Sequence, residues 1–341
     1  METLWYALLG LFLAGYLVLG GLDQGVALLS ARQAEVPPAG ALDHRRLMLN
    51  AVGPFLLGNE VWLVAWAGLL IGAFPLLEGE LFAALHPVVG VALAGSITLV
   101  TAVQLRSRAS NQRARGRWDR ALVTGGALAA TGWGAVLASL LQGVPRHPDG
   151  HLDRLTALVN PFVAAGGLAL AAVVAVHGAA FLALRLPVGP AERIARSGRR
   201  LVPVALVAVG AATVVGLLTE PVRQNARQPL AAVLIPVVTV GALLAARAAL
   251  GRRRPGLAFA ATTAALALPV LLISLATWPY ALPSTVDPAG GLTVAEAAAG
   301  PATLRRLGWL TFPLLPVLLG VQVLSWWLFR GRIGARSTVF W

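Results

Sequence analysis

Long runs of apolar residues alternate with short polar connections along nearly the whole chain. About 20 consecutive apolar residues are enough for an α-helix to cross the hydrocarbon core of a bilayer. Nine segments meet this criterion, with approximate limits 4–29, 52–75, 81–105, 121–142, 157–184, 201–219, 230–249, 256–279 and 308–329. The pattern therefore predicts a single polytopic membrane domain over residues 1–341, an all-α integral membrane protein with a bundle of nine transmembrane helices.

Composition supports the membrane interpretation. Hydrophobic residues make up 57% of the chain and charged residues 12%, with a mean hydropathy of +0.76. A soluble domain carries about 25% charged residues. The first apolar run lacks a basic flank and a small-residue cleavage site, so it is predicted to be a span and not a cleavable signal peptide. The chain has no cysteine, which excludes disulfides and thiolate-ligated metal sites.

The distribution of arginine predicts the topology. The net charge is +13, and all 27 basic residues are arginines, placed mainly in the connections between spans. The odd-numbered connections and the C-terminal tail carry most of them. By the positive-inside rule this places the N-terminus outside and the C-terminus in the cytoplasm, as an odd number of spans requires. The connection at about 280–307 is then external, with one helical turn in its VAEAAAG stretch. The arginines would contact anionic lipid headgroups, and no nucleic-acid partner is expected.

The second span carries two polar residues, Asn59 and Glu60, inside an apolar run from Asn50 to Pro75. Pro54 is predicted in the first helical turn, where its missing N–H does no harm. A carboxylate at membrane depth is expensive and usually faces a protein interior, a partner or a water-filled path. Two hypotheses follow: Glu60 is a proton relay, or it is a structural acid bonded to Asn, Trp or backbone groups.

Other polar groups near the membrane allow similar pairs of hypotheses. Asp23, near the end of the first span, is either a proton-uptake or docking residue or a helix-end acid that meets an arginine or a loop backbone. His177 is expected to be a hydrogen-bonded interface residue; no spacing supports it, with His86, as an axial haem or metal ligand. The segments Ser139–Arg146 and Thr277–Thr285 are predicted turns at the external face. No soluble catalytic motif is present, which leaves a proton-handling subunit or a secondary transporter.

Five motifs occur together in one order: GLDQGVALL, RRLMLNAVGPFLLGNEVWLVAWAGLLIGAFP, SLLQGVP, LVNPF and WPYALPST. Together they resemble subunit II of cytochrome bd-type quinol oxidases, over essentially the whole chain. The resemblance implies the haem-free second subunit of a bd-type terminal oxidase in the bacterial cytoplasmic membrane. Such a complex oxidises quinol and reduces dioxygen to water, with proton uptake from the cytoplasm.

The resemblance also implies the partners and the candidate residues. The partner is subunit I, which carries haem b and haem d; this chain would bind no cofactor, apart from a structural quinone that the resemblance allows. The resemblance leaves open whether the complex contains small accessory subunits. Membrane lipid would surround the complex. No catalytic or metal-ligating residue is expected in this chain. The proton-path or buried polar candidates are Glu60, Asn59 and Asp23. The structural or interface candidates are Trp62, Gly58, Gly25, His177, Gln142, Asn160, Pro283 and Ser284.

The chain departs from the family pattern at one informative position. The family's WDGNEVW is here LLGNEVW, so Leu57 stands where the family has an aspartate proposed to conduct protons. An apolar side chain cannot relay a proton. Either Glu60 and Asp23 serve instead, or the path runs elsewhere, or the chain is a divergent paralogue. A secondary transporter is the rival from another class, although the inverted repeats typical of transporters are not visible.

Overall fold

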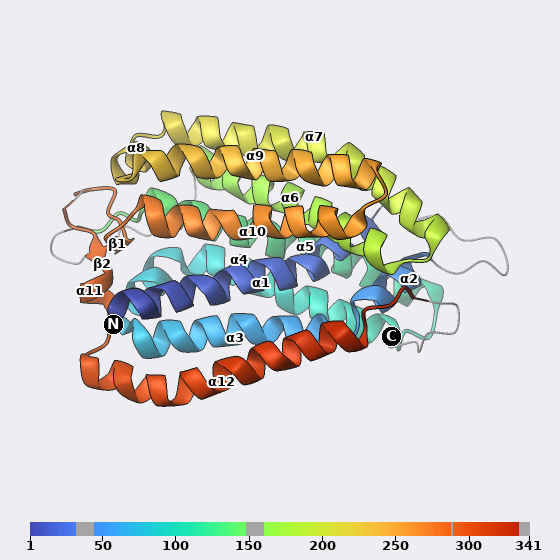
Figure 1. Cartoon of the computed structure of the whole chain (residues 1–341), viewed down its shortest axis with the longest axis horizontal. Coiled ribbons are helices and arrows are strands. Elements are labelled where there is room, and N and C mark those ends of the chain that lie inside the picture. Colours follow the sequence, from blue (N-terminus) through green and yellow to red (C-terminus); the bar gives the residue numbers. More distant parts are fainter. Residues whose placement is uncertain (32–43, 148–159, 288, 334–341) are drawn as a thin grey trace.

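A computed structural model describes residues 1–31, 44–147, 160–287 and 289–333. Within these residues the chain is almost entirely helical (Figure 1). The helices are α1 (Glu2–Ser30), α2 (His44–Val52), α3 (Leu56–Ala73), α4 (Pro75–Arg106), α5 (Gln112–Gln142), α6 (Pro161–Arg185), α7 (Val188–Leu218), α8 (Glu220–Asn225), α9 (Pro229–Gly251), α10 (Pro255–Ala276), α11 (Val294–Ala297) and α12 (Pro301–Leu328). Two short antiparallel strands, β1 (Tyr280–Leu282) and β2 (Leu292–Thr293), form a hairpin.

Nine helices in the described part of the chain are long and apolar enough to span a membrane, which confirms the predicted nine spans. They run alternately in opposite directions along the long axis of the molecule (Figure 1). We call the end where α1, α4, α6, α9 and α12 finish the arginine-rich end. The opposite end, with the β1–β2 hairpin, α8 and α11, is called the hairpin end.

Several helix boundaries differ from the sequence prediction. The second span was expected as one helix over 52–75 with Pro54 in its first turn, and this was wrong. Helix α2 ends at Val52, and α3 begins only at Leu56. Pro54 has no N–H to donate and restricts the residue before it, so the chain turns there. Helices α7 and α12 begin 13 and 7 residues before the predicted limits of 201 and 308, because hydropathy marks only the apolar part of a helix.

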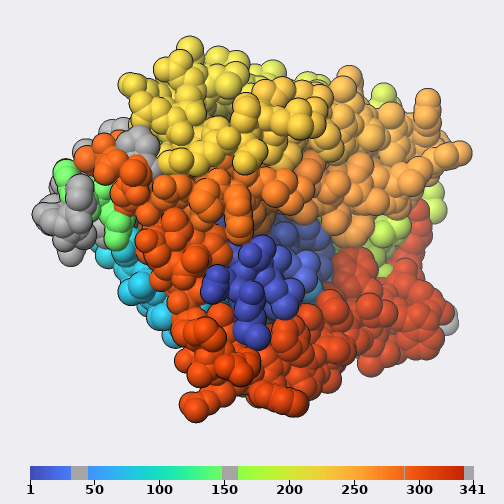
Figure 2. Space-filling model, turned by 60° about the vertical axis from the view of Figure 1, so that its left-hand side comes forward, coloured from blue at the N-terminus to red at the C-terminus, as the bar shows by residue number. Residues whose placement is uncertain are grey.

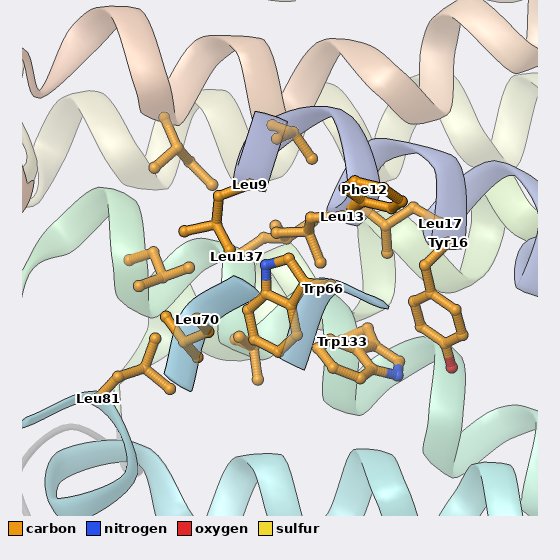
Figure 3. Packing of buried hydrophobic residues seen from close by; sticks show 14 of the residues in the cluster. Leu9, Phe12, Leu13, Tyr16, Leu17, Trp66, Leu70, Leu81, Trp133 and Leu137 are labelled. Carbon is orange, nitrogen blue, oxygen red and sulfur yellow. The ribbon is translucent and has the colours of Figure 1, made fainter. Parts of the chain in front are cut away.

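Helix α1 occupies the centre of the bundle and packs against α3, α5, α6 and α10. Small residues permit the closest approaches. A Cβ on Gly25 would lie 2.4 Å from the Val174 carbonyl oxygen, and one on Gly95 would lie 2.3 Å from the Ala129 nitrogen. Such glycine contacts let helix backbones meet within a membrane. Large side chains fill the space between α1, α3 and α5, where Trp66, Trp133 and Tyr16 lie in a row (Figure 3).

Helix α12 lies along one edge of the molecule, beside the N-terminal part of α1 (Figure 2). Most of its apolar side chains are exposed. It is held at the arginine-rich end, where Trp326 stacks on Phe55 with ring centroids 4.8 Å apart. Its exposed sides therefore face lipid or another protein.

The hairpin end is ordered by polar contacts between connections. Arg146 pairs with Glu80 at 2.9 Å and donates to the Gly290 carbonyl oxygen. The helical turn expected in the external connection is α11, which begins with a capping box between Thr293 and Glu296. The hydrogen bonds from Thr293 hold the pKa of the Glu296 carboxyl below its ordinary value.

Candidate functional site

The packing of α1 against α3 brings two predicted polar residues together. The Asn59 side-chain nitrogen donates to both carboxylate oxygens of Asp23, at 3.3 and 3.1 Å. Both side chains are buried, with exposed fractions of 0% and 3%. Among the described residues, the hydrogen-bond partner of Asp23 is thus an amide, and not the arginine or loop backbone that the sequence suggested. A buried carboxylate held by an amide satisfies part of its hydrogen-bonding capacity without a countercharge.

Glu60 lies at the border of this buried pair. It follows Asn59 on α3 and is half-buried. The neighbouring residue Asn59 is the hydrogen-bond partner of Asp23, which places Glu60 next to the pair along α3. The Oδ1 atom of Asn59 is buried and accepts no hydrogen bond from the described residues. Two carboxyl groups and one unused acceptor thus lie close together within the apolar bundle.

Leu57, at the position where the resemblance implies an aspartate, points elsewhere. It is 59% exposed and lies on the outer face of α3 with Val61 and Val64. Gly58 lies on the same side, and a Cβ there would meet nothing within 4 Å. A leucine at this position leaves the open face of α3 apolar, whereas the Asp23–Asn59 pair lies inside the bundle.

The polar line continues along α1 toward the hairpin end. Tyr16 lies seven residues before Asp23, about two helical turns away on the same face. Its hydroxyl is 3.1 Å from the Ser96 hydroxyl, and its ring packs edge-on against Trp133 (Figure 3). Sequence reasoning missed Tyr16 and Ser96; the spacing of Tyr16 from Asp23 was the available signal.

Trp62 connects α3 to two neighbours. Its indole nitrogen donates to Gln322 of α12 at 3.3 Å, and its ring packs on Phe12 of α1 with centroids 5.6 Å apart. A Cβ on Gly15 would lie 2.1 Å from the Trp62 ring, so that glycine makes room for the indole. Gln322 is a third polar residue that the sequence analysis did not single out, although it lies inside an apolar run.

His177 is a buried interface residue between α6, α1 and α10. One ring nitrogen lies 2.8 Å from the Thr262 hydroxyl, and the other lies 3.1 Å from the Val18 carbonyl oxygen. Its ring stacks on Phe259. Both nitrogens are occupied, so this side chain does not fit an axial haem ligand. Within the described residues, no group of three or more His, Asp or Glu side chains could hold a metal ion.

The remaining candidates lie at the hairpin end or begin a helix. The Asn160 side chain caps α6 by accepting from the Phe162 N–H at 2.8 Å. The Gln142 carbonyl oxygen accepts from Asn225, and the Pro283 carbonyl oxygen accepts from Val144. The Ser284 hydroxyl donates to the Arg146 carbonyl oxygen at 2.8 Å. Gln142, Pro283 and Ser284 thus join connections at the hairpin end. These residues and Asn160 lie apart from the Asp23–Asn59 pair.

The chain is similar to known proteins over its full length. The sequence model of the family "Cytochrome bd terminal oxidase subunit II" matches residues 1–329. The chain is 25% identical to the cytochrome bd ubiquinol oxidase subunit 2 of Bacillus subtilis, over 99% of this chain and 98% of that protein. It is also 25% identical to the cytochrome bd-I ubiquinol oxidase subunit 2 of Escherichia coli K12, over 98% and 95%.

A solved structure supports the fold. The bd oxidase from Geobacillus thermodenitrificans contains a chain that matches with a TM-score of 0.73 and 18% sequence identity, covering 96% of this chain and 98% of that one. With its nine apolar helices, the chain is a multi-pass protein of the bacterial cytoplasmic membrane. The matches favour an oxidase subunit over the transporter. The chain belongs to the cytochrome bd terminal oxidase subunit II family and serves as a subunit of a quinol-oxidising oxidoreductase complex.

Proposed function

We propose that this chain supports proton uptake by its oxidase through Glu60, Asn59 and Asp23, while the haems reside in the partner subunit. The observation that carries the proposal is the buried Asp23–Asn59 pair with Glu60 beside it. Acidic groups within membrane helices are costly, and they usually mark ion or proton pathways. The unused Oδ1 atom of Asn59 is a further acceptor for a water molecule in such a path.

The location of haem b and haem d in subunit I is supported by His177 and His86, the histidines inside the described membrane helices. His177 uses both ring nitrogens within the protein. His86 is exposed on α4, where one ring nitrogen lies 3.3 Å from the carbonyl oxygen of Ala83, one turn earlier. These side chains do not form a pair that could hold an iron from both sides.

The open face of α3 is the proposed docking surface for subunit I. Leu57, Val61, Val64 and Ile71 are exposed there, between 44% and 70%. Gly58 and Gly68 have nothing within 4 Å of a built Cβ, so a partner helix can approach closely. Glu60 lies at the edge of this face, and lipid tails offer its carboxyl no hydrogen bond, whereas a protein partner does.

A structural quinone in this chain is supported by an apolar cavity near the hairpin end. The cavity has a volume of about 200 Å³ and lies between α5, α6, α7, α8, α9 and α10. Phe162, Leu170, Ile235 and Pro269 are among its apolar walls, and Arg223 is its charged residue. A polyisoprenoid tail matches such walls, since apolar ligands are bound mainly by apolar side chains.

The proposed orientation places the arginine-rich end in the cytoplasm. The protein has no cysteine, so single cysteines can be introduced without background. Ser110→Cys at the arginine-rich end and Ala289→Cys at the hairpin end both lie at exposed positions. In intact cells, a membrane-impermeant maleimide is expected to label the Ala289 variant only. Labelling of the Ser110 variant alone would show that the topology is the opposite of the proposed one.

Purification from native membranes tests the assignment of the haems. We expect a tagged form of this chain to bring down a second membrane subunit, with b- and d-type absorption bands, quinol oxidase activity and extractable quinone. The chain expressed without that subunit is expected to be colourless. Haem bands in the isolated chain would contradict the proposed location of the haems, and a colourless pair without oxidase activity would contradict the proposed function.

A further inference from the structure

A second cavity lies at the arginine-rich end, away from all the residues discussed above. Its volume is about 180 Å³. It is enclosed by the end of α6, the first turns of α7, the α9–α10 connection and the segment after α12. Ala183, Ala191 and Leu250 form an apolar floor, and Arg253, Arg332 and Glu192 are the charged lining residues. The α6–α7 connection, the α9–α10 connection and the segment after α12 thus form one amphipathic pocket.

Arg332 is held in place by the segment that carries it. The Ile333 N–H donates to the Arg185 carbonyl oxygen at 2.8 Å, and the Arg185 guanidinium donates to the Gly331 carbonyl oxygen. Arg332 itself donates to the Leu186 carbonyl oxygen at 2.8 Å. A guanidinium carries five N–H donors, so Arg332 is fixed by one contact and keeps donors that can serve a ligand.

Arg253 supplies the second positive charge. It lies in the tight α9–α10 connection and pairs with Glu192 at 3.2 Å. Both partners are exposed, at 83% and 45% of their side chains, and exposed ion pairs contribute little stability. A phosphate can therefore replace Glu192 as the partner of Arg253 at small cost.

The cavity also lies at the first residue of α7, Val188. The positive end of the helix dipole adds to the field of the two arginines and favours an anion. Against two arginines and the helix terminus, Glu192 is the acidic residue in the lining. The apolar floor, by contrast, suits a hydrocarbon chain.

We propose that this cavity binds an anionic phospholipid, with its phosphodiester on Arg253 and Arg332 and an acyl chain on the alanine and leucine floor. Basic pockets between transmembrane helices bind the headgroups of anionic lipids in this way. Free phosphate carries the same negative charge but has no acyl chain to contact the apolar floor. A phospholipid and free phosphate therefore predict different results.

The test uses the complete oxidase complex in detergent, titrated with dioleoyl phosphatidylglycerol, dioleoyl phosphatidylcholine or inorganic phosphate. Native mass spectrometry counts the lipids that remain bound. The wild-type complex is expected to retain phosphatidylglycerol over phosphatidylcholine. The R253Q/R332Q variant is expected to lose this retention about fivefold, because two charge-assisted contacts disappear. R196Q/R200Q, which removes two exposed arginines of α7 outside the cavity, is the matched control and is expected to behave as wild type.

A variant that keeps both arginines guards against loss of assembly. Ala195 also lines the cavity, and Ala195→Phe is expected to fill part of it and to reduce phosphatidylglycerol retention while leaving the charges in place. The proposal is wrong if R253Q/R332Q retains phosphatidylglycerol like wild type, if the control variant loses it equally, or if phosphatidylcholine is retained as well. If inorganic phosphate displaces the lipid and Ala195→Phe has no effect, the site binds a free anion, and the proposal that it binds a phospholipid is wrong.

Discussion

Replacing Gly25 by leucine is expected to reduce the yield of assembled oxidase at least about tenfold, because the site has no room for a side chain. A Cβ at this position would lie 2.4 Å from the Val174 carbonyl oxygen and 2.8 Å from the Gly178 Cα. These are backbone atoms of α6, so no rotamer change relieves the clash. The two helices must separate, and α1 lies at the centre of the bundle. The measurement is the amount of complex recovered by size-exclusion chromatography in mild detergent.

Gly210→Leu provides the matched control for this effect. Gly210 lies inside α7, and a Cβ there meets nothing within 4 Å. Both changes replace a glycine inside a spanning helix by leucine, so the change in intrinsic helix propensity is the same in both variants. We expect Gly210→Leu to leave the yield unchanged. Equal recovery of the two variants would show that the α1–α6 contact does not decide assembly.

The sequence predicted the spans well because each depends on local hydropathy. The fifth span, for example, was expected over 157–184, and α6 runs from Pro161 to Arg185 with Asn160 as its cap. The break at Pro54 was missed because proline is tolerated in a first turn, and only the packing of α2 distinguishes a start from an interruption. The extra turns of α7 and α12 were missed because polar residues can continue a helix beyond the apolar run.

The arrangement of the candidate site could be predicted only in part. Asp23 and Asn59 were both recognised as polar residues inside spans, but their pairing was not. They are 36 residues apart, and their contact depends on the rotation and depth of α1 relative to α3. The hydropathy pattern predicts neither the rotation nor the depth of a helix relative to its neighbour. The exposed position of Leu57 has the same origin, since the rotation of α3 about its axis decides that Leu57 faces outward while Asn59, two residues later, faces the bundle interior.

Replacing Glu60 by glutamine is expected to lower quinol-dependent oxygen consumption about tenfold or more, since general acid–base groups commonly contribute that much or more. Glutamine preserves size and hydrogen bonding but cannot release a proton. Because Glu60 is half-buried and lies beside the Asp23–Asn59 pair, the complex should assemble normally. Asp23→Asn is expected to act in the same direction, with the amide still beside Asn59. Turnover and proton uptake would be measured on the same purified complex, and Glu296→Gln at the exposed hairpin end is the matched control.

Introducing an acid at Leu57 provides the sharper test of the same relay. Leu57 precedes Glu60 by one helical turn, and residues spaced in this way are neighbours on a helix surface. If the path enters from the open face of α3, Leu57→Asp should recover part of the turnover lost by Glu60→Gln. If the path depends only on Asp23 and Asn59, Leu57→Asp should have no effect. Unchanged turnover and unchanged yield in both Glu60→Gln and Asp23→Asn would rule out a proton relay in this chain, and these buried acids would then act in structure alone.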